Sequence, residues 1–401
     1  MSDANRHNTV KYMTYLMFFA FAMTTDAVGV IIPQVVKEFD LSLTQAGAFH
    51  YVTMVTIAVG GIGLGSLADT WGRKPVILVG LGLFAVACYG FMLSQYFWMF
   101  LCLLAMMGLA IGLFKTGALA LIGDISQDSH AHTRTMNAVE GFFGVGAIVG
   151  PAVVTYLVAT GAHWSQLYLL AGALCSVLLI VAWRVRYPEY VRHEQNAASF
   201  KSTIRLVNNP YALGFSMAIA LYVAIEVAIF VWMPTLLADY VGQFEWLATY
   251  ALTIFFVLRT AGRFMAVWIL ARFCWTAVIC VFTGLIFLCY LGAMVFGTEA
   301  AIFLLPLSGL FMSMIYPTLN SKGISCFARQ QHGSVAGLIL FFTAVSAALA
   351  PLLMGLIGDA FGHVRYGFIL ATILSACLFA GMLYNWLKQP ARDRLAQLQA
   401  S

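Results

Sequence analysis

Long apolar runs follow one another along almost the whole chain, separated by short polar stretches. A helix that crosses the roughly 30 Å hydrocarbon core of a bilayer needs about 20 apolar residues. The pattern predicts an all-α integral membrane protein with twelve transmembrane helices. The predicted spans are 11–36, 44–68, 75–94, 97–122, 134–158, 165–186, 209–240, 245–271, 273–296, 299–325, 332–357 and 365–388.

One polar stretch interrupts this pattern between the sixth and seventh spans, at residues 184–210 (RVRYPEYVRHEQNAASFKSTIRLVNNP). It predicts an N-terminal six-helix bundle over 1–186, a cytoplasmic linker over 187–208 and a C-terminal six-helix bundle over 209–401. Two such halves are typical of a secondary transporter whose site lies at their interface near the midplane. A channel or a membrane enzyme is the competing class. The enzyme is disfavoured because HExxH, GxSxG, P-loop and paired-cysteine patterns are missing, so we expect no catalytic residue, metal or cofactor.

Composition and charge agree with a membrane environment. Of 401 residues, 62% are hydrophobic and 9% are charged, against about 25% charged in soluble domains. Most of the 21 lysines and arginines lie at one set of helix ends, and the positive-inside rule makes that side cytoplasmic, with both termini on it. We expect a multi-pass protein of the cell (inner) membrane that contacts lipid. The net charge of +5 thus reflects topology, and no nucleic-acid partner is expected.

The loop after the second span reads GSLADTWGRKPVIL at residues 65–78. It resembles the cytoplasmic loop signature of the major facilitator superfamily, G-x-L-A-D-x-x-G-R-K. The resemblance implies two pseudo-symmetric six-helix bundles, alternating access, a monomer, and gating by Gly65, Asp69, Gly72 and Arg73. Physically, Gly65 permits close helix approach, Gly72 suits a tight turn, and the Asp69 carboxylate can face a helix N-terminus. For Arg73 and its neighbour Lys74, the alternative is that they only obey the positive-inside rule.

A narrower resemblance joins four further segments to the fucose, glucose and galactose permease branch of that superfamily. The resemblance implies proton-coupled uptake of a monosaccharide. The segments are VIIPQV at 30–35, YVAIEVAIFVWMPTLL at 222–237, AGRFMAVWILARF at 261–273 and GLFMSMIYPTLNSKGI at 309–324.

A sugar site needs amides, carboxylates and aromatic faces among apolar walls. Asn137, Asn320, Tyr222, Tyr316 and Trp232 are the candidates for substrate binding. For the aromatic residues, the alternative is a packing or lipid-facing role, since Phe, Trp and Tyr make up 14% of the chain.

A few ionisable residues fall inside the predicted spans, where a central charge costs from about 2.5 to more than 10 kcal/mol. Such charges usually face a cavity or an opposite charge. Asp26, Glu226 and Glu140 are therefore the candidates for proton coupling. The acidic residues are Asp26, Glu140 and Glu226, and the basic ones are Lys115, Arg259 and Arg263.

Depth and spacing refine these candidates. Asp26 and Glu226 lie about 20 to 25 Å from the cytoplasmic ends of their spans at about 1.5 Å per residue. Lys115 and Glu140 lie at similar distances from the turn that joins their helices, so we expect them to pair. The alternative for all six charges is that they neutralise one another and only hold helices together.

Lys115 departs from the sugar-permease pattern, which often has a glutamate at this point of the fourth helix. Lys115 and Arg259 therefore support a second hypothesis, in which they bind an anionic sugar derivative or organic acid. A third hypothesis, drug or metabolite antiport, comes from the G-x-x-x-G-P element at Gly146, Gly150 and Pro151, which we interpret mainly as helix packing. We therefore expect a small-molecule substrate, a sugar or a sugar acid, and H⁺ or Na⁺ as the coupling ion.

Overall fold

The computed structural model describes residues 3–64, 67, 71–125, 129–185, 187, 206–328, 331–392 and 394, and these contain helices but no strand. The chain divides into two compact units, residues 1–193 and 194–401. The division falls inside the polar stretch between the sixth and seventh predicted spans. Each unit is described by itself below.

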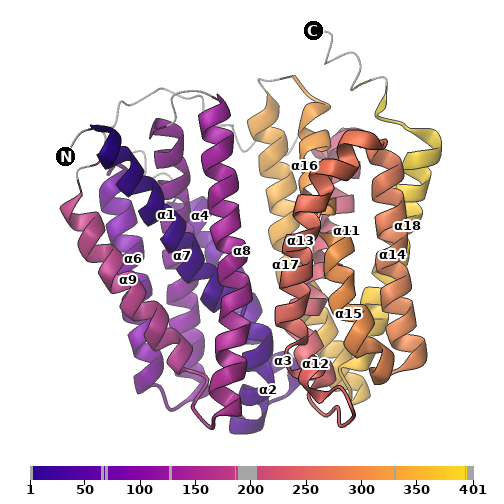
Figure 1. Cartoon of the computed structure of the whole chain (residues 1–401), viewed down its shortest axis with the longest axis horizontal. Coiled ribbons are helices and arrows are strands. Elements are labelled where there is room, and N and C mark those ends of the chain that lie inside the picture. The colour runs from indigo at the N-terminus through magenta and orange to yellow at the C-terminus, as the bar shows by residue number, and fades with distance from the viewer. Residues whose placement is uncertain are drawn as a thin grey trace. The chain divides into compact units, whose positions relative to one another are not determined.

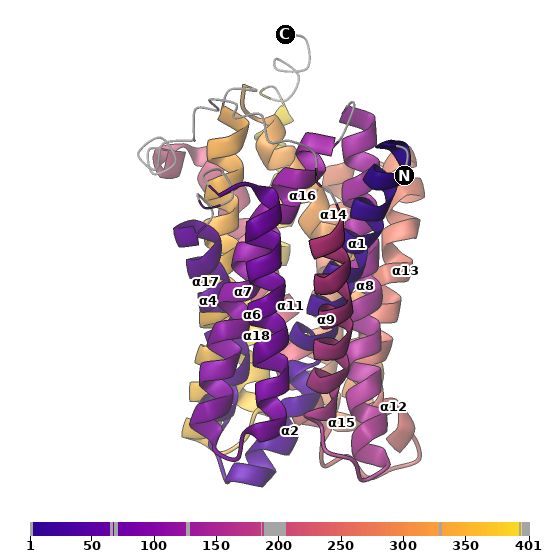
Figure 2. The ribbon, with the colours of Figure 1, turned by 90° about the vertical axis from the view of Figure 1, so that its left-hand side faces the viewer.

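The first unit is a bundle of long helices together with the shorter α2 and α3 (Figure 1, indigo to magenta). In Figure 2, where this unit faces the viewer, its long helices run roughly parallel to one another. Its helices are α1 (Asp3–Thr25), α2 (Val28–Phe39), α3 (Leu43–Ala46), α4 (Ala48–Leu64), α6 (Arg73–Leu93), α7 (Phe97–Ile125), α8 (Ser129–Ala159) and α9 (Gln166–Arg184).

Glycines let two pairs of these helices approach closely. A side chain at Gly108 of α7 would collide with Thr56 of α4. Side chains at Gly146 and Gly150 of α8 would collide with backbone carbonyl oxygens of α1, including that of Met23. The packing interpretation of the G-x-x-x-G-P element is therefore confirmed.

The second unit is arranged around α11, most of which is buried (Figure 1, rose to yellow). α11 begins after Asn209, whose side chain accepts hydrogen bonds from the N–H groups of Tyr211 and Ala212, with Pro210 at the first helical position. The elements are η1 (Leu206–Asn208), α11 (Pro210–Leu237), α12 (Glu245–Thr249), α13 (Ala251–Arg272), α14 (Trp275–Phe296), α15 (Thr298–Met312), α16 (Ile315–Ser325), α17 (His332–Phe361) and α18 (Arg365–Lys388).

Two buried hydrogen bonds fix α11 against α17. The Ser346 hydroxyl donates to the carbonyl oxygen of Ala220 at 2.6 Å. The Trp232 indole N–H donates to the carbonyl oxygen of Pro351 at 3.1 Å. The two bonds use positions 12 residues apart on α11, so they help to set the register of the two helices.

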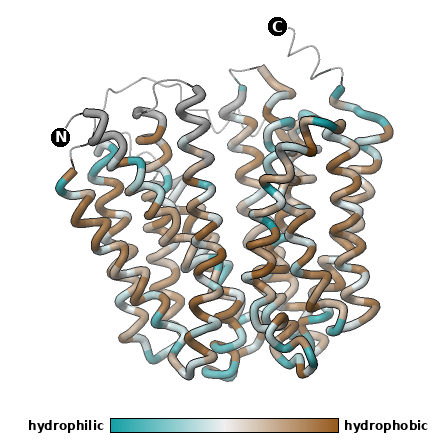
Figure 3. The backbone as a smooth tube through the Cα atoms, in the orientation of Figure 1, coloured by the Kyte–Doolittle hydropathy of each residue, from teal (hydrophilic) through white to brown (hydrophobic). Residues whose placement is uncertain are grey.

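Eleven helical segments of the described chain are long and apolar enough to cross a membrane. Figure 3 shows that apolar residues dominate the long helices. The remaining predicted span, 44–68, corresponds to α4, for which 17 residues to Leu64 are described. A multi-pass membrane protein follows from these segments, and the total of twelve stays a prediction.

Two predicted spans are interrupted well inside their length. The first is interrupted at Asp26 and Ala27, between α1 and α2. The tenth is interrupted at Ser313 and Met314, between α15 and α16. Interrupted membrane helices commonly surround transporter binding sites, because irregular backbone is tolerated at membrane depth only where it is buried in protein or lines a cavity. Candidate residues lie at both interruptions.

Candidate functional site

A buried ion pair lies in the second unit. The Glu226 carboxylate on α11 accepts from the Arg259 guanidinium on α13, with 2.6 Å between Oε1 and Nη2. Glu226 is 7% exposed, and the Arg259 side chain is 20% exposed. Glu226 is the single acidic residue of α11, and its charge is therefore balanced by the guanidinium of Arg259 on α13. Desolvated pairs of this kind are strongly coupled, because removal of one partner leaves a buried charge.

Tyr222 extends this pair toward the interruption of the tenth predicted span. It lies one turn before Glu226 on α11, and its hydroxyl lies 2.6 Å from Glu226 Oε1. The same hydroxyl lies 3.0 Å from the carbonyl oxygen of Met312, the last residue of α15. Tyr222 is 1% exposed. The hydroxyl therefore joins the ion pair to the end of α15.

The helix after this interruption carries two other predicted substrate residues. Tyr316 lies in the first turn of α16, with its ring centroid 6.5 Å from that of Tyr222. Asn320 lies one turn further along α16 and is half-buried. Arg263 lies one turn after Arg259 on α13 and acts electrostatically on Tyr222. Tyr222 and Arg259 thus contact the Glu226 carboxylate directly, and the Tyr316 ring of α16 lies beside Tyr222.

Trp232 occupies a different environment. Its side chain is fully buried, and its indole N–H is bonded to the Pro351 carbonyl of α17. The ring therefore serves helix packing, which is the alternative considered for the aromatic candidates. It shares α11 with Glu226, but no hydrogen bond joins it to the ion pair.

In the first unit, Lys115 lies on α7 among aromatic rings. Its ammonium lies 5.2 Å from the ring centroid of Phe143 and 5.9 Å from that of Phe18. Glu140 and Asp26 act on it electrostatically. Glu140 is exposed on α8, and in the described part of the chain it forms no direct ion pair with Lys115. The expected Lys115–Glu140 pair is replaced by cation–π contacts, each worth about 0.5–2 kcal/mol.

Asp26 lies at the interruption between α1 and α2. The Thr25 hydroxyl lies 3.1 Å from its Oδ2 atom and 3.0 Å from the carbonyl oxygen of Phe21. The Thr24 hydroxyl also donates to the Phe21 carbonyl, at 2.9 Å. Threonine side chains that bond back to the preceding turn compete with helix continuation. Two such bonds thus lie directly before the interruption at Asp26.

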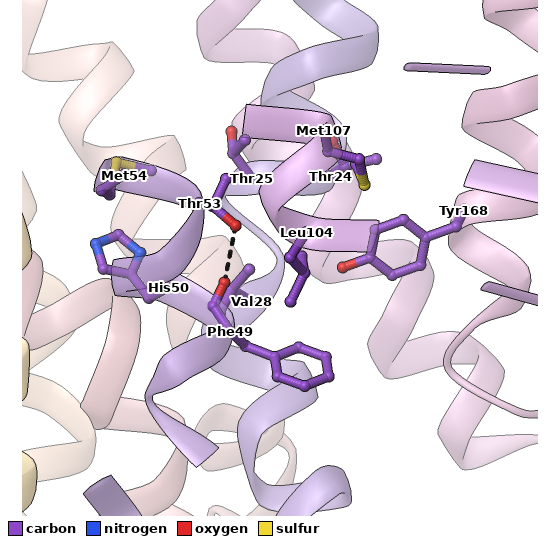
Figure 4. A pocket seen from close by; sticks show the side chains of 10 residues that line it. All are labelled: Thr24, Thr25, Val28, Phe49, His50, Thr53, Met54, Leu104, Met107 and Tyr168. Atoms are coloured by element: carbon purple, nitrogen blue, oxygen red, sulfur yellow. Dashed lines mark hydrogen bonds between the residues drawn. The ribbon is translucent and has the colours of Figure 1, made fainter. Parts of the chain in front are cut away.

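A small cavity lies beside this interruption (Figure 4). Threonine, methionine and aromatic side chains from α1, α4, α7 and α9 face it. The Tyr168 hydroxyl, which Figure 4 shows pointing toward the other lining residues, is fully buried and makes no hydrogen bond in the described part of the chain. The Tyr168 ring stacks on Phe91 with a centroid distance of 3.8 Å. The lining residues are Thr24, Thr25, Val28, Phe49, His50, Thr53, Met54, Leu104, Met107 and Tyr168.

Two of the predicted gating residues lie within the described residues. Gly72 precedes α6 with a φ of +88°, a conformation that favours glycine. Arg73 is the first residue of α6 and is half-buried. Gly65 and Asp69 lie outside the described residues, as does the side chain of Asn137.

Lys74, which follows Arg73, has a specific partner. Its ammonium donates to the carbonyl oxygens of Trp183 at 2.7 Å and Val185 at 2.8 Å, at the end of α9. It also lies 5.6 Å from the ring centroid of Tyr187. Lysine at a helix C-terminus satisfies carbonyls that lack an intrahelical partner. The side chain therefore ties the start of α6 to the end of α9.

The described residues contain no group of three or more His, Cys, Asp or Glu side chains able to hold a metal ion. The chemistry available in the two clusters is ion pairing, hydrogen bonding and proton exchange. It suits the binding and release of a polar solute or a proton.

Comparison with known proteins identifies the family. The sequence matches the profile of the Major Facilitator Superfamily over residues 14–351. The L-fucose-proton symporter of Escherichia coli is 22% identical over 404 residues, which cover 90% of this chain and 90% of that protein. The niacin transporter NiaP of Acinetobacter baylyi is 24% identical over 201 residues, 50% of this chain, and the match spans less than half (45%) of that transporter.

Solved structures agree on the fold. A crystal structure of the Escherichia coli fucose:proton symporter superposes with a TM-score of 0.64 and 20% identity, covering 93% of this chain and 98% of that one. At this identity, the likeness concerns the fold. Because the family profile covers most of the sequence, the chain belongs to the Major Facilitator Superfamily and is a multi-pass membrane transporter rather than an enzyme.

Proposed function

We propose that this protein takes up a monosaccharide together with a proton, and that Glu226 carries the proton. The observation that supports this most directly is the buried Glu226 carboxylate held by Arg259 at 2.6 Å and by the Tyr222 hydroxyl at 2.6 Å. A proton on Glu226 cancels its charge and loosens its hold on Arg259. Coupling follows if Glu226 binds its proton more tightly in one conformation than in the other.

Sugar recognition is assigned to the same part of the second unit. Tyr316 and Asn320 of α16 supply an aromatic face and an amide, and Arg259, when released, supplies hydrogen-bond donors for hydroxyl groups. The similarity of the whole chain to an L-fucose-proton symporter supports this substrate class. In the first unit, Asp26 is proposed as a second proton site, with Lys115 and Glu140 as the charges that tune it.

The transport cycle is proposed as rocking of two six-helix halves, 1–186 and 209–401, joined by the 187–208 linker. The protein acts as a monomer in the cell (inner) membrane with both termini in the cytoplasm. Gly65, Asp69, Gly72 and Arg73 form the proposed gate between the second and third spans.

Purified protein in vesicles with an imposed proton gradient tests this function. A panel of labelled hexoses should show one that accumulates against its own gradient and dissipates the proton gradient as it enters. The Glu226→Gln variant should lose accumulation while it still exchanges labelled for unlabelled sugar. If no hexose accumulates or competes, the sugar assignment is wrong.

An anionic substrate is the second candidate, because three cations (Lys115, Arg259 and Arg263) lie inside membrane-spanning helices. Similarity to a niacin transporter over half of the chain also favours it. In the same vesicles, sugar acids and aromatic carboxylates should then compete for uptake where neutral hexoses do not. Replacement of Lys115 by methionine should abolish transport of the anion. Outward movement of label driven by inward protons would instead indicate antiport.

A further inference from the structure

One hydroxyl hydrogen in the second unit faces two acceptors. The Tyr222 hydroxyl lies 2.6 Å from Glu226 Oε1 and 3.0 Å from the Met312 carbonyl oxygen. A tyrosine hydroxyl donates one hydrogen but can also accept. It therefore cannot donate fully to both acceptors at once, and the protonation state of Glu226 decides which one receives the hydrogen.

With Glu226 ionised, the carboxylate is the stronger acceptor because charge-assisted hydrogen bonds are shorter and stronger than neutral ones. The shorter of the two distances agrees with this assignment. The Met312 carbonyl is then held only weakly. As the last residue of α15, Met312 is among those whose carbonyls lack a regular intrahelical partner.

When Glu226 is protonated, the hydrogen bond between Glu226 and Tyr222 reverses its direction. The new carboxyl O–H donates to the Tyr222 oxygen, and the Tyr222 hydrogen turns to the Met312 carbonyl. One proton is added to the carboxylate, no other covalent bond changes, and each group keeps a partner. Hydrogen bonds in such a chain strengthen one another.

The reversed hydrogen bond involves Met312, which lies next to the helix that carries the predicted substrate residues. Met312 immediately precedes the interruption at Ser313 and Met314, and α16 with Tyr316 begins directly after it. α13, which carries Arg259, reaches the same point, since a side chain at Gly262 would collide with Ser313. The interruption therefore contacts both the helix that holds the cation and the helix that carries the predicted sugar residues.

We propose that the Tyr222 hydroxyl transmits protonation of Glu226 to the α15–α16 interruption by reversing its hydrogen bond, which makes Tyr222 a positioning residue for proton coupling. The inference rests on the proposed role of Glu226 as the proton site. The charged and titratable groups that act on this cluster are Arg259 and Arg263 from α13 and Tyr290 from α14.

Difference infrared spectroscopy between high and low pH tests this inference on the full chain in lipid. The Glu226→Gln variant identifies the carboxylic-acid carbonyl band of Glu226 by removing it. In Tyr222→Phe, the band should shift upward, because the acid loses its acceptor. Tyr290→Phe is the matched control, since it removes an equally buried hydroxyl that donates to the Ile225 carbonyl at 2.7 Å and should leave the band in place.

Transport supplies the functional readout. Tyr222→Phe should lose most of the pH dependence of sugar binding, whereas Tyr290→Phe should keep it. An unshifted carbonyl band in Tyr222→Phe, or an unchanged pH profile of binding, overturns the inference.

Failure of the proposed transport function can be distinguished from failure of the inference about Tyr222. If wild-type protein moves no protons with sugar, the proposed function fails whatever the spectra show. If Tyr222→Phe does not fold, wild-type protein with isotope-labelled tyrosine replaces it. Its tyrosine C–O band should then change with pH in the wild type and not in Glu226→Gln, and a tyrosine band that is indifferent to pH in both overturns the inference.

Discussion

The ammonium of Lys74 donates a 2.7 Å hydrogen bond to the carbonyl oxygen of Trp183, 109 residues away in the sequence. The bond crosses from the first turn of α6 to the end of α9. It gives a structural role to a lysine for which the sequence left the positive-inside rule as an alternative.

Loss of this contact should destabilise the first unit. Lys74→Met removes two hydrogen bonds to carbonyls and should lower the free energy of unfolding by about 1.5–3 kcal/mol. Thermal unfolding of the purified protein measures the change, with Lys388→Met as the control because Lys388 is exposed at the end of α18. Lys74→Arg should recover part of the loss. Equal melting temperatures for Lys74→Met and Lys388→Met would contradict the capping role.

The Glu226–Arg259 pair predicts strong non-additivity. Arg259→Met leaves a buried carboxylate without its cation and should destabilise the protein by about 3–5 kcal/mol. The double variant Glu226→Gln with Arg259→Met should be more stable than Arg259→Met alone, because no charge is then left unpaired. A double-mutant cycle of unfolding temperatures measures this coupling, and additive effects would show that the two side chains act independently.

Close packing of α8 on α1 predicts a contrast between two glycines of one helix. Gly150→Ala would push a methyl group into the Met23 carbonyl and should cost about 1–3 kcal/mol. Gly141→Ala, on the same helix with nothing near the added methyl group, should be neutral or stabilising. Unfolding of the two variants side by side gives the comparison. Equal stability would mean that α8 shifts freely on α1.

Loss of the hydroxyl group should change stability differently at two buried tyrosines, Tyr168 beside the cavity and Tyr290 on α14. Tyr168→Phe removes a fully buried hydroxyl that has no partner in the described part of the chain, so it should leave stability unchanged or raise it slightly. Tyr290→Phe removes a hydroxyl bonded to Ile225 and should cost about 1 kcal/mol. A clear loss of stability in Tyr168→Phe would show that the hydroxyl is bonded to water inside the cavity.

Cys274 and Cys326 lie outside the membrane-spanning segments, and we expect a thiol reagent to modify them in a fixed order as the pH rises. A hydrogen bond from Thr276 lowers the pKa of the exposed Cys274 thiol, whereas burial raises the pKa of Cys326 to about 11. Because the thiolate is the reactive form, a maleimide should modify Cys274 first as the pH rises from neutral. Mass spectrometry of the labelled protein reports the order. Thr276→Val should slow labelling of Cys274 alone, and faster labelling of Cys326 would contradict the assignment.

The apolar runs alone predicted the membrane helices, because each span must be apolar over its whole length whatever it packs against. The same logic singled out Glu226 and Arg259, since charges are rare in such runs. Their pairing was not predicted. The pairing depends on how α11 and α13 are rotated about their axes, and the sequence between the two residues carries no direct record of that rotation.

The helix interruptions were also missed, although a local signal exists for each. Thr24 and Thr25 bond back to the Phe21 carbonyl, and the Ser313 hydroxyl donates to the carbonyl of Leu310. Back-bonded hydroxyl side chains therefore accompany both interruptions, but Thr53 and Thr283 bond in the same way inside continuous helices, so this signal alone does not locate a break. Tyr168 gave no such signal, because one tyrosine among 17 becomes notable only when its surroundings are known.

Trp232 gives the protein a built-in optical reporter. Its indole is fully buried and bonded to the Pro351 carbonyl, whereas most of the other eight tryptophans are exposed. A chain that retains Trp232 alone would report, through the wavelength of its emission, whether α11 and α17 keep their register during each turnover.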